Sequence, residues 1–333
     1  MLDLTVNEIK NLTFTVRKTP VLSPFNGSFV VADPSLLTPD ETPDKTWRMF
    51  FHTTFGVYQF RSIDGVTFEK VQKVVSRAMR PNINRVGETY YLFFERTRPL
   101  IFNALNLANL AEWRSHICVC TGPDLIHWSK PRPVVTTAHG YEISPRGSSI
   151  SNPFLLEIDG KYRLYYSCGL TFIDDCGFCE PTYIQYAESD KVDEGYRSIE
   201  EPILSPDESS PYLNLCSGCL KVYRVKDGYI GVQNGIYEKN GESHSAILLL
   251  TSPDGKKFDF AKMLVTPDSD DEKSWMHQFV YASHLVRYGN VLRLYFNARD
   301  TSDMLKGREC IGFAEAVLKE PSPNSTGSKR KDR

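Results

Sequence analysis

A repeated unit is the sequence feature that most constrains the fold of this 333-residue chain. Five times, a short strand dense in aromatic residues is followed by a turn and a third apolar strand, and it usually has another apolar strand before it. Short runs of aromatic and β-branched residues favour strands over helices. Three or four strands per repeated unit are typical of β-propeller blades, whereas a β-sandwich would not require five matching units. The aromatic strands are WRMFFHTT (47–54), YYLFFERT (90–97), YRLYYSCG (162–169), YIGVQNG (229–235) and LRLYFNAR (292–299).

We therefore predict an all-β, five-bladed β-propeller that spans residues 1–319 as a single domain. Several units contain the turn S-x-D-G-x-x-F, as at 62–68 and 252–258, and Asp-Gly supplies the positive φ of a tight hairpin. The fifth unit leads into a polar stretch, residues 320–333, which we expect to be a disordered tail. The outer strand that this unit lacks is predicted to come from residues 12–18 (LTFTVRK), which would close the ring and remove an exposed sheet edge.

The composition limits which classes of partner the protein can bind. The formal net charge is -2 and the pI about 6.4, so no global positive field attracts a nucleic acid or an anionic membrane. The first residues lack the basic and apolar segments of a signal peptide, and no apolar run approaches the length of a membrane span. These features predict a cytoplasmic protein that binds neither nucleic acid nor membrane.

Alignment of the five units places two rings of polar residues around a central funnel, on the face where propellers usually bind ligands. The first ring opens the innermost strands and the second ends the aromatic strands. Each residue also has a structural alternative, as a strand cap, a turn residue or an ion-pair partner. The first ring is Asp33, Arg80, Asn152, Ser217 and Ala282; the second is His52, Glu95, Ser167, Asn234 and Asn297, with Arg299 and Asp300 just beyond it.

These motifs resemble the five-bladed propeller glycosidases of glycoside hydrolase families 43, 32, 117 and 130. The resemblance covers residues 28–316. It rests on VADPSLL (31–37), on ISNPFLLEIDGKYRLYY (150–166), on the S-x-D-G turns, and on LRLYFNARD and ECIGFAEA within 292–316. It implies a sugar-active enzyme with a small carbohydrate as its substrate. We expect Arg80, Asn152, His52, Ser217, Asn297, Arg299 and Asp300 to bind that substrate.

The resemblance also implies catalytic positions. In the family 43 pattern an Asp on blade 1 is the general base, an Asp on blade 3 tunes pKa values and a Glu on blade 4 is the general acid. Asp33 matches the first position, but Asn152 occupies the second, and the third falls within residues 216–219, which contain no carboxylate. Most glycosides need an acid to protonate the leaving oxygen. Possible replacements are Glu95, Glu180, Glu238 and His277; we favour Glu95 or His277, since the family 117 type uses a histidine as the acid.

Two C-x-x-C pairs form a further candidate site: Cys176 with Cys179, and Cys216 with Cys219. The first is predicted to lie in the loop between strands 2 and 3 of blade 3, and the second at the start of blade 4. Four thiolates at this spacing suit a tetrahedral zinc ion. Two disulfides, or buried thiols without a ligand, are the alternatives.

Three functions are compatible with these features. The first is a glycoside hydrolase with Asp33 as base, Glu95 or His277 as acid, and sugar rings stacked on aromatic residues. A glycan-binding propeller without catalytic groups is the second, and a metal-dependent enzyme built around the paired cysteines is the third. We favour the hydrolase because most known members of this fold act on sugars, although a fold alone does not decide function. The candidate stacking residues are Phe55, Tyr58, Phe172 and Trp275.

Overall fold

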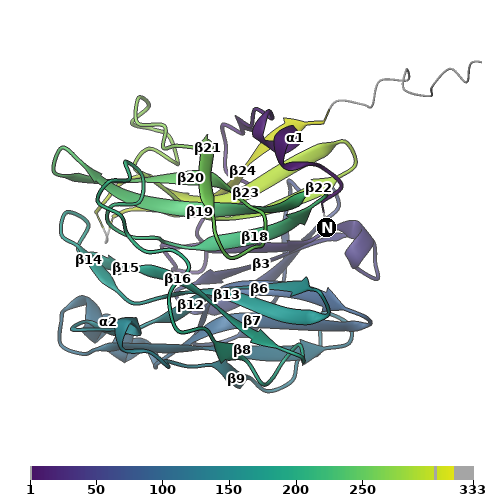
Figure 1. Ribbon diagram of the computed structural model, residues 1–333, viewed down its shortest axis with the longest axis horizontal. Coiled ribbons are helices and arrows are strands. Elements are labelled where there is room, and N and C mark those ends of the chain that lie inside the picture. Colours follow the sequence, from purple (N-terminus) through teal and green to yellow (C-terminus); the bar gives the residue numbers. More distant parts are fainter. Residues whose placement is uncertain (1, 304–305, 319–333) are drawn as a thin grey trace, which may run out of the picture.

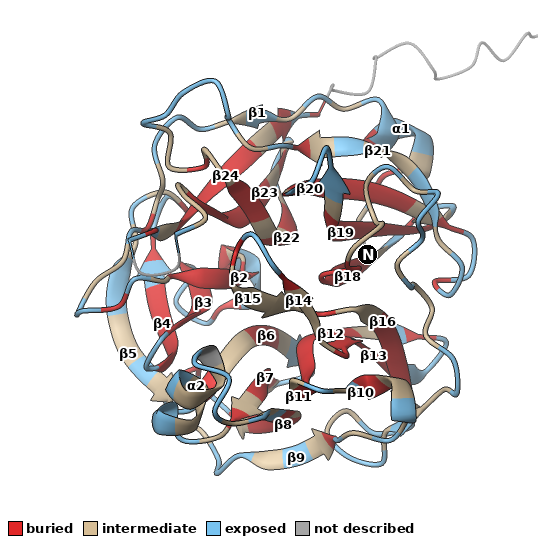
Figure 2. Cartoon of the chain, turned by 90° about the vertical axis from the view of Figure 1, so that its left-hand side faces the viewer, coloured by how far each residue is buried: buried red, intermediate tan, exposed pale blue. Residues whose placement is uncertain are grey.

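The computed structural model describes residues 2–303 and 306–318, so the predicted tail at 320–333 lies outside the described residues. Five antiparallel sheets stand around a central axis, which is seen end-on in Figure 2. The chain forms them in order and builds each from the axis outward. The predicted all-β, five-bladed propeller is confirmed. Among the described residues, no helix is both long and apolar enough to cross a membrane.

The first three blades contain the following strands. Blade 1 comprises β2 (Ala32–Leu37), β3 (Trp47–Thr53), β4 (Gly56–Ser62) and β5 (Glu69–Val75). Blade 2 comprises β6 (Ala78–Val86), β7 (Thr89–Thr97), β8 (Trp113–Gly122) and β9 (Arg132–Val135), and β8 also pairs with the small hairpin of β10 (Ile143–Ser144) and β11 (Gly147–Ser148). Blade 3 comprises β12 (Ile150–Ile158), β13 (Lys161–Cys168), β16 (Tyr183–Ser189) and β17 (Arg197–Ser198).

The last two blades complete the ring. Blade 4 comprises β18 (Leu220–Val225), β19 (Gly228–Lys239), β20 (Glu242–Ser252) and β21 (Asp259–Val265). Blade 5 comprises β22 (Phe279–Tyr288), β23 (Val291–Arg299), β24 (Glu309–Val317) and β1 (Thr15–Val16). Short 3-10 turns, η1 (Pro39–Glu41) and η2 (Gly140–Glu142), interrupt the loops of blades 1 and 2.

Two insertions depart from the repeat, and both lie at the same end of the propeller, on the left of Figure 1. Helix α2 (Leu100–Leu107) joins β7 to β8, and the hairpin of β14 (Thr171–Ile173) and β15 (Phe178–Glu180) joins β13 to β16. In blades 1 and 4 the equivalent connections are tight turns. The hairpin crosses the centre of the ring in Figure 2.

The N-terminal segment closes the ring as predicted. Strand β1 pairs with β24, with Thr15 opposite Glu315 and Val16 opposite Ala314. Helix α1 (Val6–Lys10) precedes β1 and buries Ile9 in the core shared by blades 4 and 5. The pairing satisfies the edge of β24 that would otherwise be open to another chain.

Hydrogen bonds from one blade to the next hold the inner strands in register. Ser35 Oγ accepts from the backbone N–H of Ile83 at 3.0 Å, and Asn82 Oδ1 accepts from that of Leu155 at 2.9 Å. Between blades 5 and 1, His284 Nδ1 accepts from the backbone N–H of Leu36 at 3.1 Å. Burial lowers the pKa of His284 to about 3, with a further contribution from the charge of Lys221, so its ring is neutral and can accept this bond.

The S-x-D-G turns also join neighbouring blades. Tyr295 on β23 donates to the carbonyl of Gly65 at 2.6 Å, and Tyr165 on β13 donates to the carbonyl of Gly255 at 2.7 Å. The repeated turn therefore has two roles, because it reverses the chain and is held by a tyrosine on the aromatic strand of the preceding blade.

Replacing Ile9 with alanine tests whether the N-terminal segment is part of the core. Ile9 is buried, so we expect the free energy of unfolding to fall by about 2–4 kcal/mol. Urea denaturation measures this change. The neighbouring Lys10 is exposed, and Lys10→Ala should change stability by less than about 0.5 kcal/mol. Equal losses of stability from the two substitutions would contradict the packing of the N-terminal segment into the core.

Candidate active site

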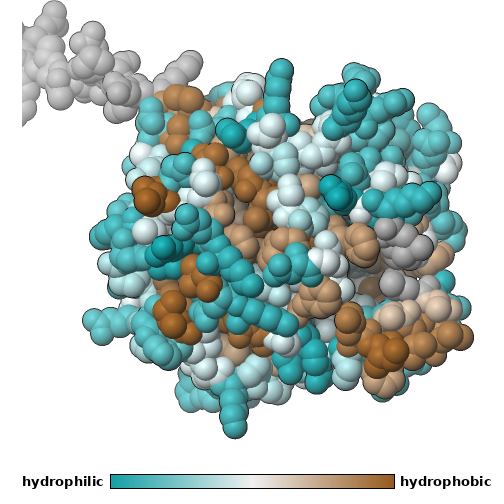
Figure 3. Space-filling model, turned by 180° about the vertical axis from the view of Figure 1, so that it is seen from behind, coloured by the Kyte–Doolittle hydropathy of each residue, from teal (hydrophilic) through white to brown (hydrophobic). Residues whose placement is uncertain are grey.

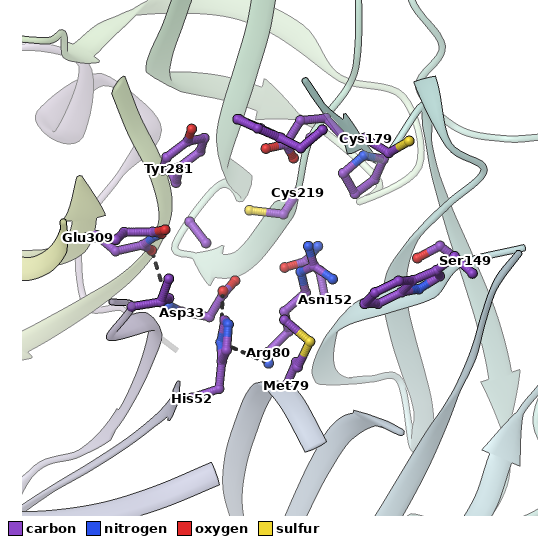
Figure 4. A pocket seen from close by; sticks show the side chains of 18 of the residues that line it. Asp33, His52, Met79, Arg80, Ser149, Asn152, Cys179, Cys219, Tyr281 and Glu309 are labelled. Atoms are coloured by element: carbon purple, nitrogen blue, oxygen red, sulfur yellow. Dashed lines mark hydrogen bonds and ion pairs between the residues drawn. The ribbon is translucent and has the colours of Figure 1, made fainter. Parts of the chain in front are cut away.

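A cavity of about 550 Å³ opens where the inner strands begin, beneath the two insertions. Figure 4 shows side chains from different blades converging on it, with Asp33, Arg80 and Asn152 near its centre and Glu309 and Tyr281 to one side. Its polar lining residues are Asp33, His52, Thr54, Arg80, Asn103, Asn106, Ser149, Asn152, Glu180, Asn234, Asn297, Arg299 and Glu309. Six of the ten catalytic and substrate-binding residues predicted from the sequence line it: Asp33, His52, Arg80, Asn152, Asn297 and Arg299.

A strained backbone bulge directs the first ring into this cavity. Asp33, Arg80 and Asn152 have φ angles of 55°, 51° and 50°, in the left-handed region that side chains other than glycine rarely adopt. Each lies at a register shift between the first and second strands of its blade. Strain of this kind persists where the surrounding structure enforces it, and it is frequent at functional sites.

Blade 4 uses glycine at the equivalent position. Gly218 has a φ of 58°, and a Cβ there would lie 2.2 Å from the carbonyl oxygen of Asn234. Gly218 and, in blade 5, Tyr281 line the cavity, so the predicted alignment was displaced by one residue in these two blades. Ser217, predicted to bind substrate, is fully buried and is not among the lining residues; Ala282 lines the cavity next to Tyr281.

Asp33 is a buried carboxylate held in its ionised form. Its Oδ2 lies 3.2 Å from Nδ1 of His52, and its backbone N–H donates to Asn297 Oδ1 at 3.1 Å. Burial favours the neutral acid, but the hydrogen bond to His52 and the positive charges of Arg80 and Lys221 outweigh it. The pKa of Asp33 is therefore below its ordinary value of 3.8.

Arg80 is fixed by Glu95, which lies behind it. Arg80 Nη1 is 2.5 Å from Glu95 Oε2, and Glu95 Oε1 accepts from the indole N–H of Trp113 at 3.2 Å. Glu95 is fully buried and is not among the residues that line the cavity. The negative charges of Glu95, Asp33 and Glu180 raise the pKa of Arg80 despite its burial. The geometry therefore gives Glu95 a structural role, as the ion-pair partner of Arg80. Because Glu95 does not line the cavity, the predicted role of general acid does not fit it.

Glu180 is the carboxyl group whose position the repeat did not reveal. It ends β15 in the inserted hairpin and lines the cavity. Burial raises its pKa to about 8, and the charges of Glu309 and Asp33 act in the same direction, against Arg80. Among the described residues, no hydrogen bond contributes to the pKa of this carboxyl group.

Glu309 is a third carboxyl group in the cavity. Asn297 donates to it through Nδ2, and Arg299 Nη1 lies 3.9 Å from its Oε2. Burial, reinforced by the charge of Asp33, raises its pKa even so. Asn297 therefore bridges Glu309 and the backbone of Asp33.

Asn152 provides an unused hydrogen-bond acceptor. Its side chain is buried, and its Oδ1 has no hydrogen-bond partner among the described residues. A buried polar atom without a partner is costly, and a ligand that donates to it removes this cost.

Other predicted residues lie outside the cavity lining. His277 and Asp300 are absent from it, and Asp300 Oδ1 accepts from the backbone N–H of Arg308 at 2.8 Å. Glu238 is an exposed residue near the end of β19. The four predicted stacking aromatics are also elsewhere, and the aromatic residues that line the cavity are Trp113, Phe178 and Tyr281.

The cysteines are free thiols. Cys179 and Cys219 line the cavity, whereas Cys176 contacts Ser243 Oγ at 3.2 Å and Cys216 is buried beside Ile236. Burial raises the pKa of both Cys176 and Cys219 to about 11. Within the described part of the chain, no three His, Cys, Asp or Glu residues lie close enough to hold a metal ion, so the four cysteines do not fit the predicted zinc site.

Comparison with known proteins relates the fold to carbohydrate-active enzymes. No protein-family profile matches the sequence, and no curated protein matches it. Among solved structures, an N-acetylgalactosamine deacetylase from F. plautii, in complex with blood group B trisaccharide, has a TM-score of 0.60 at 13% identity, over 92% of this chain and 95% of that one. A β-1,2-mannobiose phosphorylase from Listeria innocua has a TM-score of 0.62 at 11% identity, over 92% and 97%.

A GH130-family structure, from a family described as mannoside phosphorylases that include β-1,2-mannoside hydrolases, has a TM-score of 0.60. It shares 15% identity over 94% of this chain and 95% of that one. These similarities show the five-bladed fold of glycoside hydrolase-like propellers, including hydrolases and phosphorylases that act on glycans.

Replacing Glu95 with alanine tests its assignment as the partner of Arg80. Removal of one member of a buried ion pair leaves the other charge uncompensated, so we expect the free energy of unfolding to fall by about 3–5 kcal/mol. Chemical denaturation measures this loss. Glu238→Ala, at an exposed glutamate, is the matched control and should be nearly neutral. A Glu95→Ala variant as stable as the wild type would refute the assignment.

Proposed function

We propose that this protein hydrolyses a glycosidic bond by general acid–base catalysis, with Asp33 as the base and Glu180 as the acid. The observation that carries the proposal is the opposite shift of two carboxyl pKa values in one cavity. The pKa of Asp33 lies below its ordinary value of 3.8, so this group is ionised at neutral pH, whereas Glu180 keeps its proton up to about pH 8. Pairs of titratable groups with such divergent environments are typical of acid–base sites.

In the proposed reaction, Asp33 removes a proton from a water molecule while the oxygen of that water attacks the anomeric carbon. Glu180 gives its proton to the glycosidic oxygen as the bond from that oxygen to the anomeric carbon breaks. The products are the free sugar and the leaving alcohol, and exchange with solvent returns the two carboxyl groups to their starting states. The fold relatives described as glycoside hydrolases and phosphorylases support a glycan as the substrate.

The remaining polar groups have defined roles in this proposal. His52 keeps Asp33 ionised through its hydrogen bond, and Lys221 does so through its positive charge. Asn152 Oδ1, which has no partner in the described structure, accepts a hydrogen bond from a sugar hydroxyl. Arg80, held by Glu95, orients the sugar near Asp33.

The pH dependence of kcat/KM tests the pair. Loss of the Glu180 proton should lower activity above an apparent pKa of about 8, because the acid is then spent. Protonation of Asp33 should lower it only below its ordinary pKa of 3.8. Hydrolysis of an alkyl glycoside, whose leaving group needs the proton, supplies the rates, measured with and without inorganic phosphate. An alkaline limb that survives in Glu180→Gln would exclude this residue as the acid.

Two substrates with different leaving groups separate the two roles. We expect Glu180→Gln to reduce the hydrolysis of an alkyl glycoside by about 10²–10⁴-fold. It should reduce that of a dinitrophenyl glycoside far less, because a dinitrophenolate leaves without a proton. Asp33→Asn should impair both substrates to a similar extent, since both need the base. Glu238→Gln is the control, and a loss of activity in it equal to that of Glu180→Gln would count against the assignment.

A further inference from the structure

The two insertions give the cavity an apolar wall that faces a polar floor. The first ring, from the inner strands, supplies Asp33, Arg80 and Asn152 to the floor. The insertions and the strand ends beside them contribute mainly carbon-rich side chains: Met79, Leu100, Ala104, Trp113, Leu170, Phe178 and Pro181.

On the side of this wall that belongs to α2, three side-chain nitrogens are already engaged within the protein. Asn106 Nδ2 donates to the carbonyl of Ala111 at 2.8 Å, and Asn103 Nδ2 lies 3.5 Å from Thr97 Oγ1. The indole N–H of Trp113 donates to Glu95 and to Ser115 Oγ at 3.2 Å, so the ring presents carbon atoms to the cavity. These donor nitrogens are therefore engaged within the protein, and the surface that the wall presents is mainly carbon.

The apolar wall continues to the outside of the molecule. Leu100, Ile101 and Leu110 are 46%, 62% and 73% exposed, and Leu100 also lines the cavity. The α2 region, at the lower left of Figure 1, forms a hydrophobic patch at the lower right of Figure 3. A contiguous exposed apolar surface beside a cavity is typical of a binding site, unlike single exposed leucines.

This division of the cavity limits what can lie in each half. A sugar ring carries hydroxyl groups on several carbons, and burying them against apolar side chains without partners is unfavourable. An alkyl or aryl group has no such requirement, and it gains free energy when it leaves water for this wall.

We propose that the substrate is a glycoside with an apolar leaving group, whose sugar lies on the polar floor and whose alkyl or aryl aglycone lies against α2 and the β14–β15 hairpin. This inference rests on the proposed function. Glu180 ends the same hairpin, so the acid lies where the wall meets the floor. That is the position of the glycosidic oxygen in a molecule that bridges the two halves.

Binding of a free aglycone tests the wall without any catalysis. We expect 4-methylumbelliferone, followed by its fluorescence, to bind saturably to the wild type and about tenfold more weakly to a variant with Leu100→Asn and Ala104→Asn. Both residues are exposed, so the variant should fold. The control is Ile63→Asn, because Ile63 is 89% exposed. It lies in the turn after β4, whereas the cavity residue Thr54 precedes the other end of that strand.

Absence of saturable binding, or equal weakening by Ile63→Asn, would overturn the inference. An apolar patch can also bind a second copy of the chain, and sedimentation velocity measures whether the protein forms such a dimer. A dimer that the Leu100→Asn and Ala104→Asn variant dissociates would also overturn it.

An alkyl series connects the wall to hydrolysis. For methyl, butyl and octyl glycosides of one sugar, the leaving alcohols are of similar acidity, so differences in kcat/KM report the aglycone contact. We expect the octyl glycoside to exceed the methyl glycoside by roughly 10- to 100-fold in the wild type. The ratio should fall toward one in the Leu100→Asn and Ala104→Asn variant and persist in Ile63→Asn. A ratio near one in the wild type would refute the inference.

The two experiments separate failure of this inference from failure of the proposed function. If no glycoside is hydrolysed while 4-methylumbelliferone binds at the wall, acid–base hydrolysis is wrong and the apolar site stands. If glycosides are hydrolysed without regard to alkyl length, the hydrolysis stands and the aglycone site is wrong.

Discussion

Closure of the ring is the constraint on which the rest of the structure depends. No single blade contains the site, because Asp33 comes from blade 1, Glu180 from blade 3 and Glu309 from blade 5. Their side chains meet only while five inner strands remain in register around one axis. The pairing of β1 with β24 covers the edge of β24 and ties the N-terminal segment to the last blade, and the hydrogen bonds between neighbouring inner strands fix their relative heights.

Within this ring, burial has opposite outcomes at two carboxyl groups. Removal from water favours the neutral acid in both cases. At Asp33, the hydrogen bond to His52 and the nearby positive charges reverse that preference. At Glu180, the charge of Arg80 opposes burial, but two carboxyl groups reinforce it. A single cavity thus holds one carboxyl group ready to accept a proton and another ready to donate one.

The structure also divides its repeated and non-repeated parts between different tasks. The repeat supplies the polar floor, since the same bulge recurs with left-handed backbone at Asp33, Arg80 and Asn152. The insertions after β7 and β13 supply what differs between blades, namely the apolar wall and Glu180. A symmetric scaffold holds the polar floor in this arrangement, and the loops that break the symmetry hold Glu180, the proposed acid.

By itself, the sequence determined the fold, the closing strand and most of the polar floor. Strand patterns and turn motifs act over a few residues, so their periodicity can be recognised without coordinates, and an aligned repeat places equivalent residues such as Asp33, Arg80 and Asn152 on one ring. The alignment slipped by one residue at Ser217 and Ala282, because the glycine of blade 4 and the tyrosine of blade 5 do not resemble their counterparts.

Only the tertiary structure decided which carboxyl groups reach the cavity. Glu95 ends a repeated strand and appeared to face the funnel, yet it lies behind Arg80 as its ion-pair partner. Glu180 lies in a hairpin outside the repeat, so its position had no counterpart in other blades to reveal it. Long-range packing sets the burial and the neighbouring charges of each group, and these fix its proton affinity; no local pattern of residues encodes them.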